Sequence, residues 1–491
     1  MNQKYRRRNT ASNTSLKIAL FTCIVAAIAV VLLFFDRQYV YYDGQIYSAD
    51  VTTIDLRGST DVNVDKLCLM DSLQLIDLRQ SALTPEQADK IKERMPECRL
   101  LWSVPVARQT FDSNTASLVL DNPSEDDLRM LRYFDSVESI TVNNCTLYDA
   151  MSEYNLTSPD DVDIVWTVPI GGRLYKSNTV TVKLPEATAE DIRQLQHLPA
   201  LTSADLNGCT AYEQIVDFAK AHPDCDVSWT VDLAGTAVSS KETELDISGT
   251  KITDVDAFEK QLGYLPNLEK LIMCDCGLSN EKLDELNKKY ENIKIVWRVY
   301  FGKWSLRTDA TAFSTQQPEK PTYRLTDKEV TVLKYCTDLE MLDLGHQSLT
   351  SVDSFADLTN LKVLILADNR ISDISPLYKL TKMEYFEMFI NRISDISVVE
   401  YMPNLTDVNF CWNRVYDPSP LYTHQHLERV WMCGGGMSGA TKREFMAALP
   451  DVEFDLYSTY GSTNGSWRHN EHFSKIRDGF RNHNGMNDYH W

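Results

Sequence analysis

Basic residues are scarce in this chain: 49 lysines and arginines stand against 70 aspartates and glutamates among 491 residues. The first 35 residues contain five basic residues and no acidic one, so they carry +5 and the remaining residues carry −26 of the net −21. This acidic remainder has no basic stripe, and it repels the phosphates of DNA and RNA. We therefore expect no nucleic-acid partner.

Short catalytic motifs are also missing. The sequence has no G-x-S-x-G nucleophile turn, no P-loop, no H-E-x-x-H zinc motif and no calcium-loop pattern. His469 and His472 form one close pair of histidines, and His424 and His426 form another. The sequence specifies no third metal ligand, so we interpret the pairs as an exposed helix face and a solvated loop. We expect no catalytic residues, no metal and no cofactor, and hence no enzyme.

A charge-free stretch runs from Ile18 to Phe35. As a helix it would measure about 27 Å, enough for the core of a thin bilayer. Basic residues precede it and Asp36 follows it, so the positive-inside rule predicts a cytoplasmic segment at residues 1–15 and a transmembrane anchor at 16–35. The small residues that suit a cleavage site lie inside the apolar stretch, which favours an uncleaved anchor over a signal peptide.

This interpretation places the bulk of the chain outside a cell membrane that it crosses once. Residues 36–48 would link the anchor to the remainder. Their tyrosines suit the interface between membrane and water.

The outline L-x-x-L-x-L-x-x-N-x-I/L recurs every 22 residues in the C-terminal half. Three copies carry it clearly: Leu361, Leu364, Leu366, Asn369 and Ile371; Met383, Phe386, Met388, Asn391 and Ile393; Leu405, Val408, Phe410, Asn413 and Val415. Looser copies occupy residues 339–349 and 427–437. The alternating piece predicts a short strand, and the remainder returns the chain to the next strand. One winding cannot cover its own apolar face, so successive windings must stack, with the asparagine side chains bonding buried backbone groups as a ladder.

A longer period precedes these repeats. Tryptophan ends a strand-like run at Trp102, Trp166, Trp229 and Trp297, in steps of 64, 63 and 68 residues. Each of these modules also carries the leucine-rich outline and a helix, and three of the four have an additional strand 22 residues before the outline. The turn-rich stretch after the tryptophan strand either forms a hairpin off the main sheet or continues that sheet.

These outlines resemble those of leucine-rich-repeat proteins, and "NRISDISPL" and "NRISDISVV" are similar to the 22-residue repeats of bacterial internalin-type surface proteins. The resemblance implies an α/β solenoid, with parallel strands on a concave face that binds another macromolecule and with helices and turns on the convex face. Beyond residue 48 we divide the chain into four modules (49–310), the 22-residue repeats (311–437) and a C-terminal cap and tail (438–491).

The eleven cysteines of an extracytoplasmic chain would suggest disulfides, but most occupy positions expected to be buried. Three stand at the ladder position, where leucine-rich repeats accept Asn or Cys, and two precede a tryptophan strand. We interpret these five as buried thiols: Cys145, Cys209, Cys276, Cys98 and Cys225. Cys411 and Cys433 differ, because they stand 22 residues apart at the outward seventh position. Neighbouring parallel strands lie within disulfide reach, so we expect that these two can bridge.

The third, fifth, seventh and eighth positions of each winding would face the concave side. Aromatic and apolar side chains gather there with a few charges, as in protein-binding patches. We predict a partner-binding surface made of Met341, Asp343, His346, Ile365, Tyr385, Glu387, Phe389, Ile390, Asn409, Trp412, Arg429 and Trp431. The alternative is that the chain covers this face itself, for instance with the C-terminal segment that contains Trp467 and Phe473.

The sequence thus predicts a membrane-anchored extracytoplasmic binding protein whose ligand is a protein or a cell-surface glycan. A rigid stack of strands presents its side chains with little loss of ordering entropy on binding. Two alternatives remain open: a scaffold or accessory subunit of a cell-envelope enzyme, and a self-associating surface structural protein.

Overall fold

A computed structural model describes residues 16–30, 38–157, 162–315, 322–459 and 466–483. The chain falls into two compact units, Met1–Val227 and Ser228–Trp491. The division lies within the third of the four tryptophan modules.

The transmembrane helix predicted for residues 16–35 is not found in the described part of the chain. Residues 16–30 are helical, and their side chains are exposed. Within the described ranges no helix is both long enough and apolar enough to cross a membrane. Residues 31–35, which complete the predicted span, and the predicted cytoplasmic segment 1–15 lie outside those ranges.

The segment after the predicted anchor is tied to the first module. It forms a hairpin of β1 (Tyr39–Tyr42) and β2 (Gln45–Ser48). The side chain of Tyr42 is buried, and its hydroxyl accepts a hydrogen bond from the backbone N–H of Asn63 at 3.1 Å. Most of the predicted linker 36–48 is therefore ordered secondary structure.

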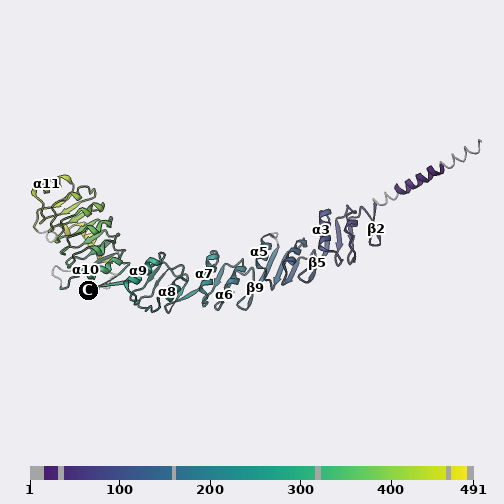
Figure 1. The fold of residues 1–491 in the computed structure, drawn as a ribbon, viewed down its shortest axis with the longest axis horizontal. Helices are drawn as coiled ribbons and strands as arrows, with labels where there is room; N and C mark the ends of the chain where they lie inside the picture. Colours follow the sequence, from purple (N-terminus) through teal and green to yellow (C-terminus); the bar gives the residue numbers. More distant parts are fainter. Residues whose placement is uncertain (1–15, 31–37, 158–161, 316–321, 460–465, 484–491) are drawn as a thin grey trace, which may run out of the picture. The chain divides into compact units, whose positions relative to one another are not determined.

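The modules share one plan of parallel strands joined by helices (Figure 1). The first contains β3 (Thr53–Asp55), α2 (Val64–Leu67), β4 (Leu75–Leu78), α3 (Pro85–Arg94), β5 (Arg99–Val106) and β6 (Gln109–Asp112). The second contains β7 (Ser117–Asp121), α4 (Glu125–Met130), η1 (Leu131–Tyr133), β8 (Ser139–Asn143), α5 (Tyr148–Thr157), β9 (Asp163–Ile170) and β10 (Arg173–Lys176).

The third module contains β11 (Thr181–Lys183), α6 (Ala189–Gln194), η2 (Leu195–His197), β12 (Ser203–Asp205), α7 (Tyr212–Ala221), β13 (Asp226–Ser228), β14 (Thr230–Leu233) and β15 (Thr236–Ser239). The fourth contains β16 (Glu244–Asp246), α8 (Val255–Leu262), β17 (Lys270–Ile272), α9 (Asn280–Lys289), β18 (Lys294–Val296), β19 (Arg298–Phe301) and β20 (Trp304–Arg307). The sequence did not predict β16, because it precedes its partner β17 by 26 residues, with Leu245 opposite Leu271, instead of by 22.

Local sequence explains where the helices begin. Thr84 caps α3: its side chain accepts from the N–H of Gln87, whose own side chain accepts from the N–H of Thr84. Pro85 follows at the first helical position, where its missing N–H costs nothing. Ala88 and Ile91 then bury one face of the helix.

An antiparallel hairpin follows each tryptophan strand, which settles the alternative that the sequence left open. The tryptophan N–H donates to a hydroxyl 11 residues later, and the N–H of that hydroxyl residue donates back to the tryptophan carbonyl. The four pairs are Trp102 with Ser113, Trp166 with Ser177, Trp229 with Ser240, and Trp297 with Thr308, with N–H to hydroxyl distances of 3.1–3.2 Å. All four indoles are buried, so each hairpin is fixed to its module at the tryptophan.

The 22-residue repeats build a parallel sheet of seven strands in sequence order. The strands are β21 (Ala312–Ser314), β22 (Met341–Asp343), β23 (Val363–Ile365), β24 (Tyr385–Glu387), β25 (Asp407–Asn409), β26 (Arg429–Trp431) and β27 (Glu453–Asp455). The returns contain α10 (Asp327–Val330), η3 (Thr331–Tyr335), η4 (Asp353–Phe355), η5 (Ser375–Lys379), η6 (Ser397–Tyr401), η7 (Ser419–Leu421) and α11 (Gly439–Ala448). Helices α10 and α11 lie at opposite ends of this stack (Figure 1).

The central residue of each strand stands in register with its neighbours, which confirms the predicted apolar file. The file contains Phe313, Leu342, Leu364, Phe386, Val408, Val430 and Phe454. All but Phe454 are fully buried. Burial of such side chains stabilises by roughly 1.5–3 kcal/mol each, and only the neighbouring windings supply the cover.

The predicted asparagine ladder is also present. The side-chain oxygen of Asn391 accepts from the N–H of Ile371 at 2.9 Å, and its nitrogen donates to the carbonyls of Leu366 and Met388 at 2.9 and 3.1 Å. Equivalent bonds are made by Asn369 and Asn413. The carboxamides therefore satisfy backbone groups where the chain leaves each strand.

A sheet face covered by the C-terminal segment

Two rows of side chains point away from the core of the seven-stranded sheet, and we call the surface that they form the sheet face. One row contains Ala312, Met341, Val363, Tyr385, Asp407, Arg429 and Glu453; the other contains Ser314, Asp343, Ile365, Glu387, Asn409, Trp431 and Asp455. Because alternate residues of a strand face opposite sides, the rows flank the buried file on the other side of the sheet. They coincide with the third and fifth positions of the repeat.

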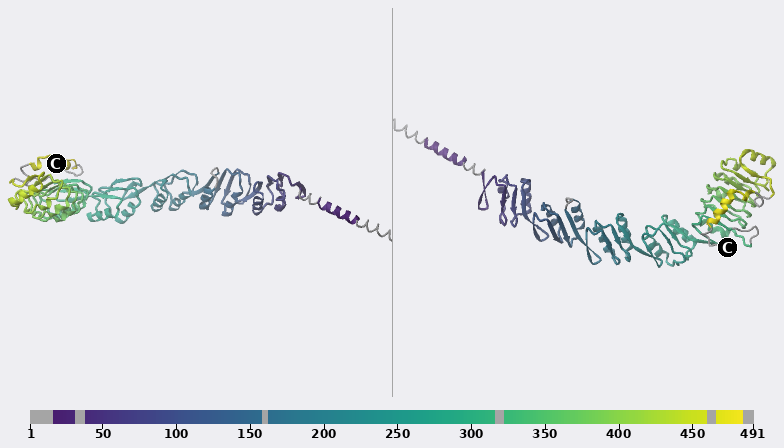
Figure 2. Two further views of the ribbon diagram at one scale, coloured as in Figure 1. Left: turned by 90° about the horizontal axis from the view of Figure 1, so that it is seen from above. Right: turned by 180° about the vertical axis from the view of Figure 1, so that it is seen from behind.

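The C-terminal segment Ser466–His483, which we call the strap, covers this face. It contains η9 (Ser466–Arg468) and α12 (Glu471–His483), and α12 crosses the strands (Figure 2). Its apolar side chains join the sheet face in one cluster: Ala312, Val363, Ile365, Ala367, Tyr385, Phe389, Cys411, Trp431, Cys433, Trp467 and Phe480, with Met341, Phe473 and Ile476 packed against them. Trp467 is completely buried.

Glu387 anchors the start of the strap. Its carboxylate is fully buried and accepts hydrogen bonds from the indole of Trp467 at 3.1 Å, from Arg468 at 2.7 Å and from the hydroxyl of Tyr385 at 3.1 Å. Two of these three donors belong to the strap. A buried carboxylate costs free energy unless it is paired, so Glu387 and the strap depend on each other.

A second acidic group lies one strand further along. Asp407 is buried, forms an ion pair with Arg429 and accepts from His472 of the strap at 3.0 Å. Arg429 in turn donates to the backbone carbonyl of Trp467 at 3.2 Å, and its guanidinium lies 4.5 Å from the centre of that indole ring. The strap thus contacts charged groups on both β24 and β25.

Electrostatics within the contact favour an ionised pair. The Glu387 carboxylate beside Arg468 raises the pKa of that guanidinium, so the arginine stays charged. Burial, together with the same carboxylate, raises the pKa of Tyr385 well above its ordinary value, so the phenol stays neutral and donates its proton.

The fit between strap and sheet face is incomplete. Four buried donor nitrogens have no acceptor within hydrogen-bond distance: Nδ2 of Asn409, Nε1 of Trp431, Nη2 of Arg429 and Nε of Arg468. Asn409 and Trp431 stand opposite each other on neighbouring strands. Each unmet buried donor costs about 1–3 kcal/mol, so the closed arrangement is less stable than its apolar contacts alone would make it.

The expectation that the twelve predicted partner-binding residues face solvent holds for only two of them. Ile390 and Trp412 are 39% and 45% exposed. Three are half-buried: Met341, Asp343 and His346. Seven are buried: Ile365, Tyr385, Glu387, Phe389, Asn409, Arg429 and Trp431. The physical reason is the strap, the covering segment that the sequence suggested as the alternative.

Beside the sheet face, the eighth positions form an exposed rim. They adopt left-handed backbone conformations, with φ of 58°, 52°, 53°, 57° and 67° at His346, Asp368, Ile390, Trp412 and Gly434. A Cβ added to Gly434 would lie 3.0 Å from the Trp412 ring, so glycine leaves the room in which that indole lies. Trp412 is not part of the apolar cluster under the strap.

Histidines and cysteines of this region depart from the sequence-based interpretation. His424 is buried, with Nε2 2.9 Å from the carbonyl oxygen of Val399, so it does not belong to a solvated loop. His472 contacts Asp407 instead of occupying an exposed helix face. The bridge suggested between Cys411 and Cys433 is not formed: both are reduced thiols, and the N–H of Cys433 donates to Sγ of Cys411 at 3.1 Å.

The other cysteines agree with the sequence. Cys98, Cys145, Cys209, Cys225 and Cys276 are all buried. Across the described ranges, no group of three or more histidines, cysteines or carboxylates is arranged to hold a metal ion.

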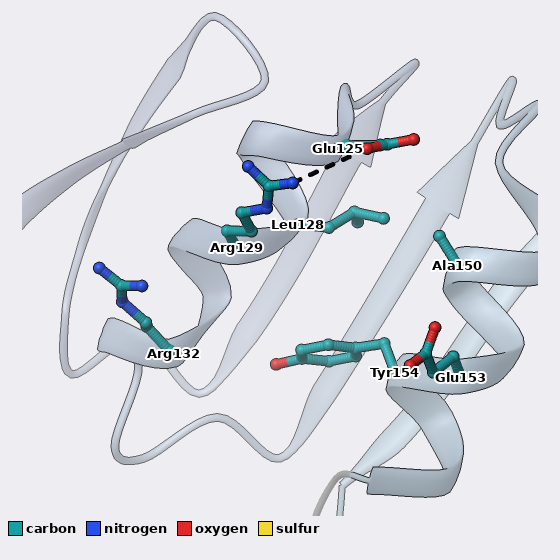
Figure 3. A pocket seen from close by; sticks show the side chains of 7 residues that line it. All are labelled: Glu125, Leu128, Arg129, Arg132, Ala150, Glu153 and Tyr154. Carbon is teal, nitrogen blue, oxygen red and sulfur yellow. Dashed lines mark ion pairs between the residues drawn. The ribbon is translucent and has the colours of Figure 1, made fainter.

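A hollow of about 450 Å³ lies in the first unit, between α4, η1 and α5 (Figure 3). It is lined by Glu125, Leu128, Arg129, Arg132, Ala150, Glu153 and Tyr154. Its cations are already paired, Arg129 with Asp126 at 2.9 Å and Arg132 with Asp89 at 3.0 Å. The hollow therefore offers no uncompensated charge to a ligand.

Sequence reasoning missed three polar members of the covered face: Asp407, Arg468 and His472. The register of the repeat contains a signal for the first, because Asp407 stands 22 residues before Arg429 and neighbouring strands place these opposite charges side by side. The strap residues carry no periodic signal of their own.

Comparison with known proteins identifies the repeats. The family model described as Leucine Rich repeats (2 copies) matches residues 337–379 and 359–401. An internalin (inlF) of Listeria monocytogenes is similar at 13% identity, with a TM-score of 0.27, over 85% of this chain and 91% of that chain.

Two further structures are similar to the chain. An internalin C2 of Listeria monocytogenes has 22% identity and a TM-score of 0.25, over 45% of this chain and 85% of that chain. A leucine-rich-repeat protein of Leptospira interrogans has 14% identity and a TM-score of 0.25, over 83% and 96%. The predicted resemblance to bacterial internalin-like leucine-rich-repeat proteins is confirmed.

Proposed function

We propose that this leucine-rich-repeat protein binds another protein through the sheet face and rim of its 22-residue repeats. One observation carries the proposal: neighbouring strands hold large aromatic and charged side chains at outward positions, where a merely solvated sheet would need neither. Tyr385, Glu387, Arg429 and Trp431 are the main examples. Aromatic residues and arginine dominate the energetics of protein interfaces.

The exposed rim provides a direct test. A photo-crosslinking amino acid in place of Trp412, in the full chain and in its native cells, is expected to give a discrete adduct with one partner. The matched control carries the crosslinker in place of Tyr401, which is 57% exposed in the η6 return. The purified partner should then bind the full chain, and Trp412→Ala should weaken binding about tenfold, as for an interface hot spot. Equal adducts from both positions, or none, would contradict the proposal.

We further propose that residues 16–35 anchor the protein in the cell membrane with its N-terminus in the cytoplasm. The support comes from sequence: a charge-free apolar stretch, basic residues before it and an acidic residue after it. The chain should stay in the membrane fraction during alkaline carbonate extraction, and protease added to intact cells should digest the repeats. Recovery of the full-length chain in the soluble fraction would refute the anchor, and a mature N-terminus beyond residue 35 would indicate a cleaved signal peptide.

A further inference from the structure

The strap occupies the sheet face as a ligand would. Its polar anchors are few and lie near its start: Trp467 and Arg468 bond to Glu387, and His472 bonds to Asp407. Its far end is held by apolar contact, with Phe480 in the cluster and Gly479 against the side chain of Met341. No disulfide joins the strap to the sheet, because residues 466–483 contain no cysteine.

Charge favours this seating. Residues 466–483 contain four lysines and arginines and two acidic residues, in a chain whose net charge is −21. The sheet face beneath them presents the buried carboxylates of Glu387 and Asp407. A cationic segment with an aromatic side chain is therefore the kind of occupant that this face accepts.

The unmet donors indicate that another occupant would fit better. Nδ2 of Asn409, Nε1 of Trp431 and Nη2 of Arg429 are buried beneath the strap without acceptors. A segment that placed a carbonyl or carboxylate oxygen against them would keep the contacts of the strap and satisfy these groups as well.

We propose that the strap is an internal ligand of the sheet face, and that the partner displaces it with a protein segment presenting an aromatic side chain next to an arginine. The aromatic–arginine pair takes the place of Trp467 and Arg468 on Glu387, and oxygens of the partner segment accept from Asn409 and Trp431. The inference rests on the proposed function and specifies the class of partner. While the strap is seated, the apparent affinity for the partner is reduced by the fraction of molecules in which the face is open.

A peptide exchange experiment tests this inference. The probe is a fluorescent synthetic peptide with the sequence of residues 466–483, titrated into the full chain in mild detergent. In the variant W467A/R468A the strap has lost its anchors on Glu387, so the peptide should bind at least about tenfold more tightly than to the wild type. Adding E387Q to that variant should abolish the gain.

The matched control is R477A, which removes a cation from the exposed side of the strap, where its ion-pair partner is the neighbouring Asp478 at 3.9 Å. It should bind the peptide like the wild type. Tryptic cleavage after Lys475 reports release of the strap and should be faster in W467A/R468A only. Should W467A/R468A fail to fold, F480D, which disrupts the other end of the strap, replaces it.

Three results would overturn the proposal. One is a released strap without tighter peptide binding, because the uncovered face would then not be a binding site. Another is unchanged tryptic cleavage in W467A/R468A, because these side chains would then not hold the strap. The third is a wild-type dimer that W467A/R468A abolishes, which would assign the face to the strap of a second copy. Crosslinking from Trp412 can still succeed in each case, so failure here is distinct from failure of the proposed function.

Discussion

The indole of Trp467 donates a hydrogen bond of 3.1 Å to the buried carboxylate of Glu387, a residue 80 positions earlier in the chain. This contact joins the end of the chain to the middle winding of the repeats. It turns a row of strand side chains from an open surface into an interior, and it makes Glu387 the residue on which the start of the strap depends.

Glu387→Gln should loosen the strap without disturbing the repeats. The amide keeps the shape of the carboxylate but not its charge, so the hydrogen bond from Arg468 is weakened. We expect a loss of about 1–3 kcal/mol in the free energy of unfolding and faster hydrogen exchange in α12, measured by urea titration and mass spectrometry. Glu384→Gln, the same change at an exposed position of the same winding, is the control, and equal effects from both variants would contradict the assignment.

Asn391→Ala should destabilise the stack of windings. It removes the partner of the Ile371 N–H and of two buried carbonyls, and unmet buried groups cost about 1–3 kcal/mol each. We expect a loss of about 2–4 kcal/mol in the free energy of unfolding. The comparison is Asn404→Ala, where an exposed side chain makes a hydrogen bond to the carbonyl of Thr381; its loss should stay near about 0.5 kcal/mol. A result for Asn391→Ala as small as that would mean that water replaces the ladder at no cost.

Two tryptophans one winding apart should respond differently to truncation. Trp431 is 3% exposed and packs against Trp467, with ring centres 5.3 Å apart, whereas Trp412 is 45% exposed. Trp431→Ala should cost about 3–5 kcal/mol of stability, and Trp412→Ala about 0.5 kcal/mol. Thermal unfolding of the two variants side by side measures the difference. Equal losses would show that the strap does not bury Trp431 in solution.

Thiol chemistry offers an independent check of the ladder. Burial raises the pKa of Cys98 and Cys276 to about 11, so at pH 8 only about one thiol in a thousand is ionised at each. Of the eleven cysteines, exposed Cys23 and half-buried Cys68 should react quickly with a chromogenic disulfide reagent. The remaining cysteines should react only after denaturation. Rapid reaction of Cys276 in the folded chain would contradict its position in the ladder.

The 22-residue outline was sufficient to predict the strands, the apolar file and the asparagine ladder, because each depends on neighbours one winding away. Strand β16 escaped prediction because its insertion changes the spacing to 26 residues. The hairpin clamps were visible as a Ser or Thr 11 residues after each tryptophan, a regularity that becomes meaningful only when both backbone bonds are seen.

The covered face was harder to predict for a physical reason. Outward positions were correctly identified, but their exposure depends on a segment with no repeat of its own. Nothing periodic links Trp467 to Glu387 or His472 to Asp407, so the sequence could offer the strap only as an alternative. Long-range contacts of this kind are decided by complementarity of charge and shape, which emerges after the windings have stacked.

The path of α12 across the strands limits how this protein can change in length. Its 13 residues measure about 20 Å, close to the roughly 19 Å between five adjacent strands. His472 meets Asp407 on β25 at one end, and Gly479 meets Met341 on β22 toward the other. Duplicating or deleting a winding between these strands would preserve the stack yet move one anchor by a full strand spacing. The strap thus acts as a gauge of repeat number, and lineages that gain or lose a winding there must also resize or discard it.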